Sequence, residues 1–440
     1  MAGDEGQQRQ AKTGAHPLKR HVAAVVAGNA LEFYDFITYA FFAVYIGRAF
    51  FPAGDAASSL LLSLATFGAG FITRPIGGVV IGSLGDRVGR ARAMVLSFSL
   101  MGIAILGMVF TPSYATIGVA APLLILFFRL LQGFALGGEV GPTTAFLVEA
   151  PPAEHRGFYG SLQGASQSVA VIAAGLASTG LAAVLDEAAL ADWGWRAVFF
   201  LGALVIPFAL IVRRSLPETL HHDGGGFDNT QHDIFGLLKA HRRVVVCGLL
   251  MLAGATIATY VALFLPTYGL TTLGLPPAWC FGATLATGIC GVIAAPSGGA
   301  LSDRIGRKPV MIAATLATMV LTVPLFLLLE RTQSGALLVL TGGLLSFIFA
   351  SGGGVMIMTV TESLPRRVRS GVMATLYALA IAIFGGTTQF NIAFLSERLH
   401  LPAAPAYYMT AAVVVAFFAV LVMPESAPVR KGALRAAAMS

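Results

Sequence analysis

The sequence predicts an all-α integral membrane protein of about twelve transmembrane helices. Hydrophobic residues make up 56% of its 440 residues and charged residues only 11%, a composition that excludes a soluble globular protein. The apolar residues form stretches of roughly twenty, the length that a helix needs to cross a hydrocarbon core about 30 Å thick. Lipid gives the backbone no other hydrogen-bond partner, so these stretches must be helices, and they lack the alternating polarity of barrel strands.

Short polar breaks set the limits of each expected span. The first eighteen residues are polar, so we expect no cleavable signal peptide and interpret the first apolar stretch as a retained span. In chain order, the expected spans are residues 21–46, 58–84, 94–112, 116–147, 157–182, 195–213, 244–269, 278–301, 310–329, 335–361, 370–395 and 405–424.

One polar break is much longer than the others. Residues 214–243 follow the sixth span and contain Pro217 and the glycines 224–226, which is typical of a linker. We therefore expect two six-helix halves. The expected domains are a cytoplasmic tail (1–20), an N-terminal bundle (21–213), a cytoplasmic linker (214–243), a C-terminal bundle (244–424) and a second cytoplasmic tail (425–440).

The positions of Lys and Arg give an independent test, because basic residues accumulate in cytoplasmic loops. With a cytoplasmic N-terminus, most of the 28 basic residues fall on the cytoplasmic side. The exceptions are Arg48, Arg196, Arg331 and Arg398 in outer loops and Arg74 and Arg129 inside the membrane. This asymmetry favours twelve spans with both termini cytoplasmic. It also explains the formal net charge of +7 without a nucleic-acid partner.

Two pairs of motifs repeat between the halves. The segment after span two, Gly82-Ser-Leu-Gly-Asp86-Arg87-Val-Gly89-Arg90, has the same register as the segment after span eight, Gly299-Ala-Leu-Ser-Asp303-Arg304-Ile-Gly306-Arg307. Spans four and ten are each followed by an acidic and a basic residue at equal spacing, as Glu149 with Arg156 and Glu362 with Arg369. Two separate repeats indicate one duplication. The alternative, ordinary positive-inside loops, does not explain the shared register.

The first pair of segments resembles the Gly-x-x-x-Asp-Arg-x-Gly-Arg signature of the major facilitator superfamily, and the resemblance covers the whole chain. It implies the major facilitator fold, with each six-helix half built as 3+3. It also implies that Asp86 latches near the start of span eleven and Asp303 near span five, holding one access state. We expect the glycines to let a short loop turn tightly and the Asp to accept from a helix N-terminus. The expected gating residues are Gly82, Asp86, Arg87, Arg90, Glu149, Arg156, Asp303, Arg304, Arg307, Glu362 and Arg369.

Polar and ionisable side chains inside the membrane are the main candidates for a functional site, because charge in lipid is expensive. They are Asn29, Glu32 and Asp35 at spacings of three in span one, Arg74 in span two, and Arg129 with Gln132 in span four. In one interpretation an arginine binds an anionic substrate while a carboxylate exchanges a proton. The alternative is a structural ion-pair network that orders these three helices.

Uncharged polar residues are weaker candidates, because they either line a cavity or join helices to one another. They are Gln163 and Gln167 in a polar stripe of span five, Tyr260 on a face of span seven with Thr256 and Thr259, and Gln389 and Asn391 in span eleven. Gly385 and Gly386 are expected to break span eleven. Gly133 and Gly137 are expected to allow close helix packing in span four.

Further segments resemble the metabolite:proton symporter family. They are GN-x-x-E-x-x-DF at 28–36, Arg74-Pro75-Ile-Gly77, Arg129-Leu-Leu-Gln132-Gly133 and RRSLPET at 213–219. Stretches at 157–170, 265–269 and 381–386 are similar to bacterial citrate and tricarballylate symporters. The resemblance implies import of a citrate-like tri- or dicarboxylate with protons. Independently, two buried arginines suit a carboxylated solute. Arg129 and Arg74 then bind its carboxylates or hold those of span one, with Glu32 and Asp35 as proton sites.

Other functions remain open. Relatives in the same family that carry 2-oxoglutarate, shikimate or zwitterionic osmolytes such as betaine share the first motifs. A sensor on a transporter scaffold usually adds a large soluble domain, which the tail after Pro424 is too short to be. An enzyme is disfavoured because no nucleophile, metal cluster or cofactor motif lies at a consistent membrane depth.

The energy source and partners follow from what the sequence contains. There is no GxxxxGK[ST] motif, so we expect an ion gradient or the solute's own gradient to supply energy, with the proton as coupling ion and no cofactor. Cys247, Cys280 and Cys290 lie in apolar stretches without CxxC spacing, so we expect no disulfide and no metal. The expected partners are a small carboxylate, protons and lipid, but no nucleic acid, for a chain that works as a monomer in a bacterial inner membrane.

Overall fold

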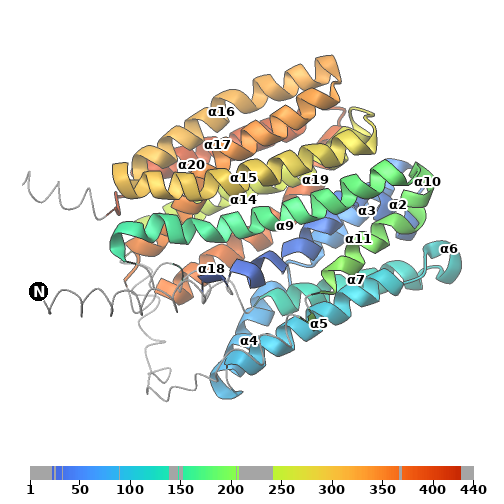
Figure 1. Ribbon diagram of the computed structural model, residues 1–440, viewed down its shortest axis with the longest axis horizontal. Coiled ribbons are helices and arrows are strands. Elements are labelled where there is room, and N and C mark those ends of the chain that lie inside the picture. The colour runs from blue at the N-terminus through green and yellow to red at the C-terminus, as the bar shows by residue number, and fades with distance from the viewer. Residues whose placement is uncertain are drawn as a thin grey trace, which may run out of the picture.

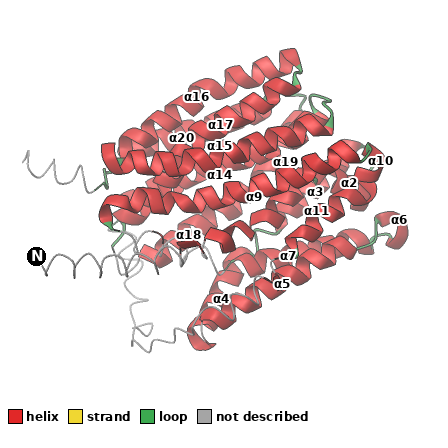
Figure 2. Cartoon of the chain, in the orientation of Figure 1, coloured by secondary structure: helices red, strands yellow, loops and turns green. Residues whose placement is uncertain are grey.

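The computed structural model describes residues 22–23, 26–31, 33–88, 90–137, 147, 152–204, 206–207, 241–365 and 369–427. In these ranges all regular structure is helical and there is no strand (Figure 2). The predicted all-α class is therefore confirmed for the described residues.

Both halves consist of a series of helices. In the first half they are Val26–Phe41, α2 (Ala43–Phe50), α3 (Ala56–Ala69), α4 (Arg74–Val88), α5 (Arg90–Phe110), α6 (Tyr114–Ile117), α7 (Ala120–Leu136), η1 (Ala153–His155), α9 (Arg156–Val184), α10 (Glu187–Ala189), η2 (Leu190–Gly194) and α11 (Trp195–Gly202). In the second half they are α14 (Arg242–Thr271), α15 (Pro277–Ile305), α16 (Arg307–Thr332), α17 (Gly335–Ser363), α18 (Arg369–Ala380), η4 (Ile381–Gly385), α19 (Gly386–Glu397) and α20 (Ala404–Val422).

Many of these helices are suited to cross a membrane. Among the described residues, eight are long and apolar enough, or nine if Val26–Phe41 and Ala43–Phe50, bent by 66°, form one span. Two shorter apolar helices, Val95–Phe110 and Ala120–Leu136, coincide with the expected third and fourth spans. The expected sixth span is described only as far as residue 207. The count of twelve therefore stays a prediction.

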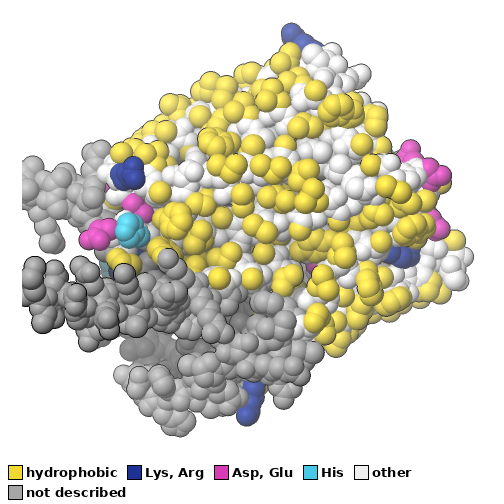
Figure 3. Space-filling model, viewed as in Figure 1, with side chains coloured by type: hydrophobic (Ala, Val, Ile, Leu, Met, Phe, Trp, Pro, Cys, Tyr) yellow, Lys and Arg dark blue, Asp and Glu magenta, His cyan; other side chains and the backbone are white. Residues whose placement is uncertain are grey.

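The outer surface of the bundle is apolar along its middle. Figure 3 shows a broad hydrophobic band between two ends where charged side chains gather. Within the helices, Val79 of α4 is 73% exposed and Val184 of α9 is 83% exposed. Large apolar side chains exposed in such numbers would be unfavourable in water and suit contact with lipid.

The two halves meet along two seams. In the first seam α9 packs beside α15 and α17, and in the second α3 packs on α19 (Figure 1). The first seam is close enough to require glycine, because a Cβ on Gly299 of α15 would lie 2.3 Å from the carbonyl oxygen of Gly157. Close packing of α9 on α15 thus joins the two halves.

The repeated Gly-x-x-x-Asp-Arg segments are more helical than predicted. α4 continues to Val88 and α15 to Ile305, so most of each segment forms the last turns of a helix. In the second segment the chain turns at Gly306, whose φ of 104° favours glycine. The expectation that the glycines let a loop turn is therefore wrong for Gly299. That residue serves helix packing instead, because the neighbouring backbone leaves no room for a side chain.

Two expected spans depart from regular α-helix near their middle, although Ala56–Ile81 and Thr375–Glu397 each qualify as one span. In the second span α3 ends at Ala69 and α4 begins at Arg74, with turns at residues 70–73. In the eleventh span the π-helical turn η4 lies between α18 and α19 and ends at Gly385, but the helix continues through Thr375–Glu397, so the π-turn replaces the expected break at Gly385-Gly386. Irregular backbone inside a membrane protein is tolerated where neighbouring helices bury it, and π-turns are frequent at functional sites.

Candidate functional site

Arg129 of α7 is buried in the interior of the N-terminal half. Its guanidinium donates hydrogen bonds to Oε1 of Gln132 and, at 3.3 Å, to the carbonyl oxygen of Phe67. Its Cζ atom lies 4.4 Å from the ring centre of Tyr39 and 5.0 Å from that of Phe36. Neutral groups and aromatic faces therefore hold this cation, an arrangement that guanidinium tolerates because it is weakly hydrated.

Arg74 lies near Arg129 because α4 and α7 pack closely. A Cβ on Gly133 would lie 1.6 Å from the carbonyl oxygen of Gly70, and the Thr73 hydroxyl donates to the carbonyl of Leu130 at 2.7 Å. The predicted packing role of Gly133 is thus confirmed. Arg74 is 5% exposed, and its Cζ atom lies 5.5 Å from the ring centres of both Phe36 and Phe71.

Asp35 lies on the same helix as Phe36 but faces a different neighbour. Its carboxylate is fully buried, and neither oxygen has a hydrogen-bond partner among the described residues. A Cβ on Gly202 of α11 would lie 3.2 Å from the Asp35 Cβ, so this part of the helix contacts span six. No ion pair joins Asp35 to Arg74 or Arg129 in the described part of the chain. The part of the alternative structural network that would pair Asp35 with an arginine is therefore not formed.

Asn29 contacts span five instead of the arginines. Its amide nitrogen lies 2.6 Å from the Ser166 hydroxyl and donates at 3.3 Å to the carbonyl oxygen of Gln163. Side chains six residues apart lie about 120° apart around a helix axis, and Asn29 and Asp35 therefore face different helices. Glu32 lies outside the described residues.

A cavity of about 160 Å³ lies between the two halves. Thr256, Thr259 and Tyr260, predicted to share a face of span seven, all line it. Gln167 of α9 also lines it, with its Nε2 atom 3.5 Å from the Tyr377 hydroxyl. The described lining contains no Asp, Glu, Lys or Arg. The cavity therefore offers hydroxyls, amides and rings to a solute, but no charge.

The other uncharged candidates lie outside this cavity. Gln163 is buried at 2% exposure on α9. Gln389 of α19 is fully buried, donates at 3.4 Å to the carbonyl oxygen of Tyr260, and leaves its own Oε1 without a hydrogen bond in the described structure. Asn391 donates at 3.1 Å to the Tyr408 hydroxyl. None of these three is among the lining residues.

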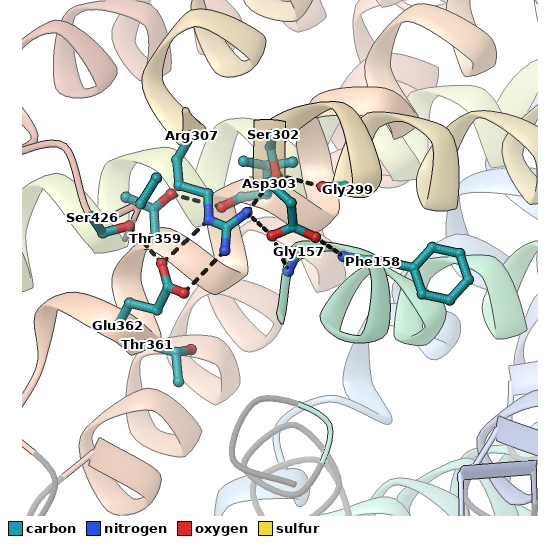
Figure 4. Close-up of polar contacts among 12 residues, drawn as sticks. Gly157, Phe158, Gly299, Ser302, Asp303, Arg307, Thr359, Thr361, Glu362 and Ser426 are labelled. Carbon is teal, nitrogen blue, oxygen red and sulfur yellow. Dashed lines mark hydrogen bonds and ion pairs between the residues drawn. The ribbon is translucent and has the colours of Figure 1, made fainter. Parts of the chain in front are cut away.

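A second group of charges lies at the end of the bundle that carries the repeated segments (Figure 4). Arg307 donates to Asp303 at 2.6 Å and to both oxygens of Glu362 at 3.1 and 3.3 Å. We call these three residues the Arg307 cluster. Asp303 also accepts from the backbone N–H groups of Gly157 and Phe158, at 2.8 and 3.0 Å. The predicted contact of Asp303 with the start of span five is therefore present, whereas its latch role stays a prediction.

The remaining gating candidates are only partly described. Arg304 is exposed, and Arg369 donates to the carbonyl oxygen of Leu364 at 3.2 Å. Arg156 begins α9 and is partly buried. Glu149 and the side chains of the first repeated segment, at Gly82, Asp86, Arg87 and Arg90, lie outside the described structure.

Two residues that were not predicted as site residues join the Arg307 cluster from the segment after α20. Ser426 donates to Glu362 at 2.7 Å. The carboxylate of Glu425 accepts from the backbone N–H groups of Arg307 and Lys308, both at 3.0 Å, and so caps α16. A repeated Pro-Glu pair, at 217–218 and 424–425, was a signal that could have identified Glu425.

At the opposite end, the second seam carries an ion pair between the halves. Asp55 caps α3 by accepting from the Ser58 N–H at 2.6 Å, and its other oxygen lies 3.1 Å from the Arg398 guanidinium. The Ser58 N–H first, together with Arg398, lowers the pKa of the Asp55 carboxyl below its usual value. Both side chains are exposed, so solvent screens the pair.

Comparison with known proteins defines the class of this chain. A model of the Major Facilitator Superfamily matches residues 25–387. The chain therefore belongs to the major facilitator superfamily, as its repeated segments predicted. Its fold resembles that of a D-xylose-proton symporter, with a TM-score of 0.76 at 18% identity over 92% of this chain and 98% of that one.

Within the superfamily the most informative relatives are bacterial symporters and permeases. The citrate-proton symporter of Klebsiella pneumoniae is 39% identical over 89% of each chain. The alpha-ketoglutarate permease of Escherichia coli is 32% identical over 94% of this chain and 96% of its own. The proline/betaine transporter of E. coli is 32% identical over 93% of this chain and 84% of its own.

Proposed function

We propose that this chain is a proton-coupled symporter that imports a citrate-like tri- or dicarboxylate by alternating access. The observation that carries the proposal is the pair of buried guanidiniums, Arg74 and Arg129, beside a cavity between the two halves. Neither forms an ion pair with a described carboxylate. Buried cations that pair with no described carboxylate can gain strong charge-assisted hydrogen bonds from an incoming carboxylate. The higher identity to a citrate-proton symporter favours a citrate-like solute.

Asp35 is the proton site in this proposal. A buried carboxylate without a hydrogen-bond partner is costly to ionise in lipid, so a proton on it stabilises the empty site. Binding of an anion at Arg129 and protonation of Asp35 would then both change the charge of the same small region of the N-terminal half. Replacing Asp35 with Asn mimics the protonated state, so uptake driven by a pH gradient should be lost while exchange of substrate across the membrane persists.

The Arg307 cluster supplies the conformational element. Asp303 connects α15 of one half to the start of α9 in the other. A rotation of the halves against each other must therefore either break these hydrogen bonds or move both helix ends together. We propose that the contact stabilises one access state, and that Asp86 makes the matching contact. The chain is further proposed to span a bacterial inner membrane twelve times, with both termini cytoplasmic, and to work as a monomer.

Uptake by proteoliposomes tests substrate and coupling together. Purified protein is offered radiolabelled citrate, tricarballylate, 2-oxoglutarate and betaine, with and without an imposed pH gradient. We expect accumulation of citrate or tricarballylate that depends on the gradient. Accumulation of 2-oxoglutarate or betaine alone would favour the second candidate, a symporter of the kind that the 32%-identical relatives represent. Equal uptake with and without the pH gradient would contradict proton coupling.

A further inference from the structure

The cavity and the buried arginines are neighbours, and Phe36 contacts both. Phe36 lines the cavity, and its ring centre lies 5.5 Å from Cζ of Arg74 and 5.0 Å from Cζ of Arg129. Neither arginine is among the cavity-lining residues. The Phe36 side chain therefore stands between the space where a solute fits and the cations that would bind it.

Aromatic residues from both halves hold Phe36 in this place. Its ring centre lies 4.7 Å from that of Phe71 and 4.8 Å from that of Phe67, and Tyr260 of the other half packs on it at 6.3 Å. Phe36 is 3% exposed, and Tyr260 packs on Phe71 at 5.7 Å. We call the rings of Phe36, Phe67, Phe71 and Tyr260 the aromatic wall. Edge-to-face contacts between rings and the contact of a guanidinium with a ring face are both favourable, so they stabilise this arrangement.

This wall prevents direct recognition of an anion in the observed conformation. A carboxylate in the cavity cannot hydrogen-bond to Arg74 or Arg129 while the Phe36 ring separates them. Attraction between charges falls with separation, and a charge-assisted hydrogen bond needs about 2.8 Å between its heavy atoms. An anion therefore gains the full interaction only after the ring has moved.

The wall lies against two breaks in the α-helical hydrogen-bond pattern, the turns at 70–73 and the π-turn η4. Phe71 belongs to the turns at 70–73 that precede Arg74. On the other side, a Cβ on Gly385 at the end of η4 would lie 2.8 Å from the Tyr260 ring. A shift of either half at these breaks would displace the rings that support Phe36.

We propose that Phe36 is a specificity-determining residue that separates the cavity from Arg74 and Arg129, and that an anionic substrate reaches the guanidiniums only when its ring moves aside. The inference rests on the proposed function for the nature of the anion. The position of the aromatic wall does not depend on the proposed function. A neutral solute would gain nothing from moving the ring, so the wall favours anions that can form bonds to both cations.

Chemical modification of arginine tests the wall without measuring transport. Purified protein in detergent is treated with phenylglyoxal, and mass spectrometry follows the modification of Arg74 and Arg129. In Phe36→Ala we expect both to react about tenfold faster than in the wild type, equivalent to ~1.4 kcal/mol of protection. Phe349→Ala is the matched control, because Phe349 also lines the cavity in the other half. It enlarges the cavity without opening the wall, so the rates should stay at the wild-type level.

Two results would overturn the proposal: wild-type arginines that react as fast as those of Phe36→Ala, or an equal acceleration in Phe349→Ala. If Phe36→Ala does not elute as a single species in size-exclusion chromatography, Phe36→Leu replaces it, with a smaller acceleration expected. Saturating citrate should slow the modification in the open variant. Fast modification that citrate leaves unchanged would support the wall and count against citrate as the ligand, so the two proposals can fail separately.

Discussion

The molecule contains two buried clusters of charge that are built in opposite ways. In the Arg307 cluster one guanidinium is shared by two carboxylates, Asp303 and Glu362, at hydrogen-bond distance. In the interior of the N-terminal half, Arg129 is held by an amide, a carbonyl and rings, while Asp35 has no hydrogen-bond partner in the described structure. A satisfied cluster stabilises one arrangement of helices. An unsatisfied cluster leaves capacity for a ligand and a proton.

This contrast predicts that the two arginines affect different properties. Arg307→Met leaves Asp303 and Glu362, whose side chains are only 8% and 6% exposed, without their cation. Removing one partner of a buried ion pair costs about 3–5 kcal/mol, so the midpoint of thermal unfolding in detergent should fall clearly. Arg304→Met, at an exposed position in the same segment, is the matched control and should leave the midpoint unchanged. An equal effect of both changes would contradict the central role of Arg307.

Arg129→Met should have the opposite effect, with stability retained and transport reduced. Methionine removes a buried cation that no described carboxylate neutralises, so the unfolding midpoint should stay the same or rise. Uptake of the carboxylate should fall about 100-fold, equivalent to one or two charge-assisted hydrogen bonds worth ~2.7 kcal/mol. The measurements are thermal unfolding and proteoliposome uptake on the same preparation. A large loss of stability together with the loss of transport would mean that Arg129 is structural, and the contrast between the clusters would disappear.

The exposed pair in the second seam should give the smallest effect. Because the pKa of Asp55 is lowered in the folded protein, its contacts stabilise the fold above the carboxyl's ordinary pKa of about 3.9 and are lost as pH falls through the lower folded value. The unfolding midpoints of wild type and Asp55→Asn should therefore differ by a small, constant amount from pH 8 to 5 and converge below about pH 4. A difference that changes between pH 6 and 8 would show that another group controls this seam.

Some contacts of individual residues were predicted from the sequence, and others were not. The contact between Asp303 and span five was implied by the resemblance of its segment to the superfamily signature, and the packing of Gly133 followed from its spacing with Gly137. The partner of Glu362 was not predicted, because the packing of α16 against α17 places Arg307 beside it. The aromatic wall was also missed. The second half of span one is rich in aromatic residues, and nothing in their order distinguishes Phe36 from its neighbours.

The sequence by itself determined the class of fold, the approximate spans and the residues that carry charge into the membrane. These depend on composition and periodicity, which act locally through the length of a helix and the energy of burying a charge. Only the tertiary structure decided which of those charges are paired, which helix each polar residue faces and what stands between the cavity and the arginines. Such choices depend on the rotation and closeness of helices far apart in the chain, and a single side chain such as Phe36 acquires its role only when those helices have packed.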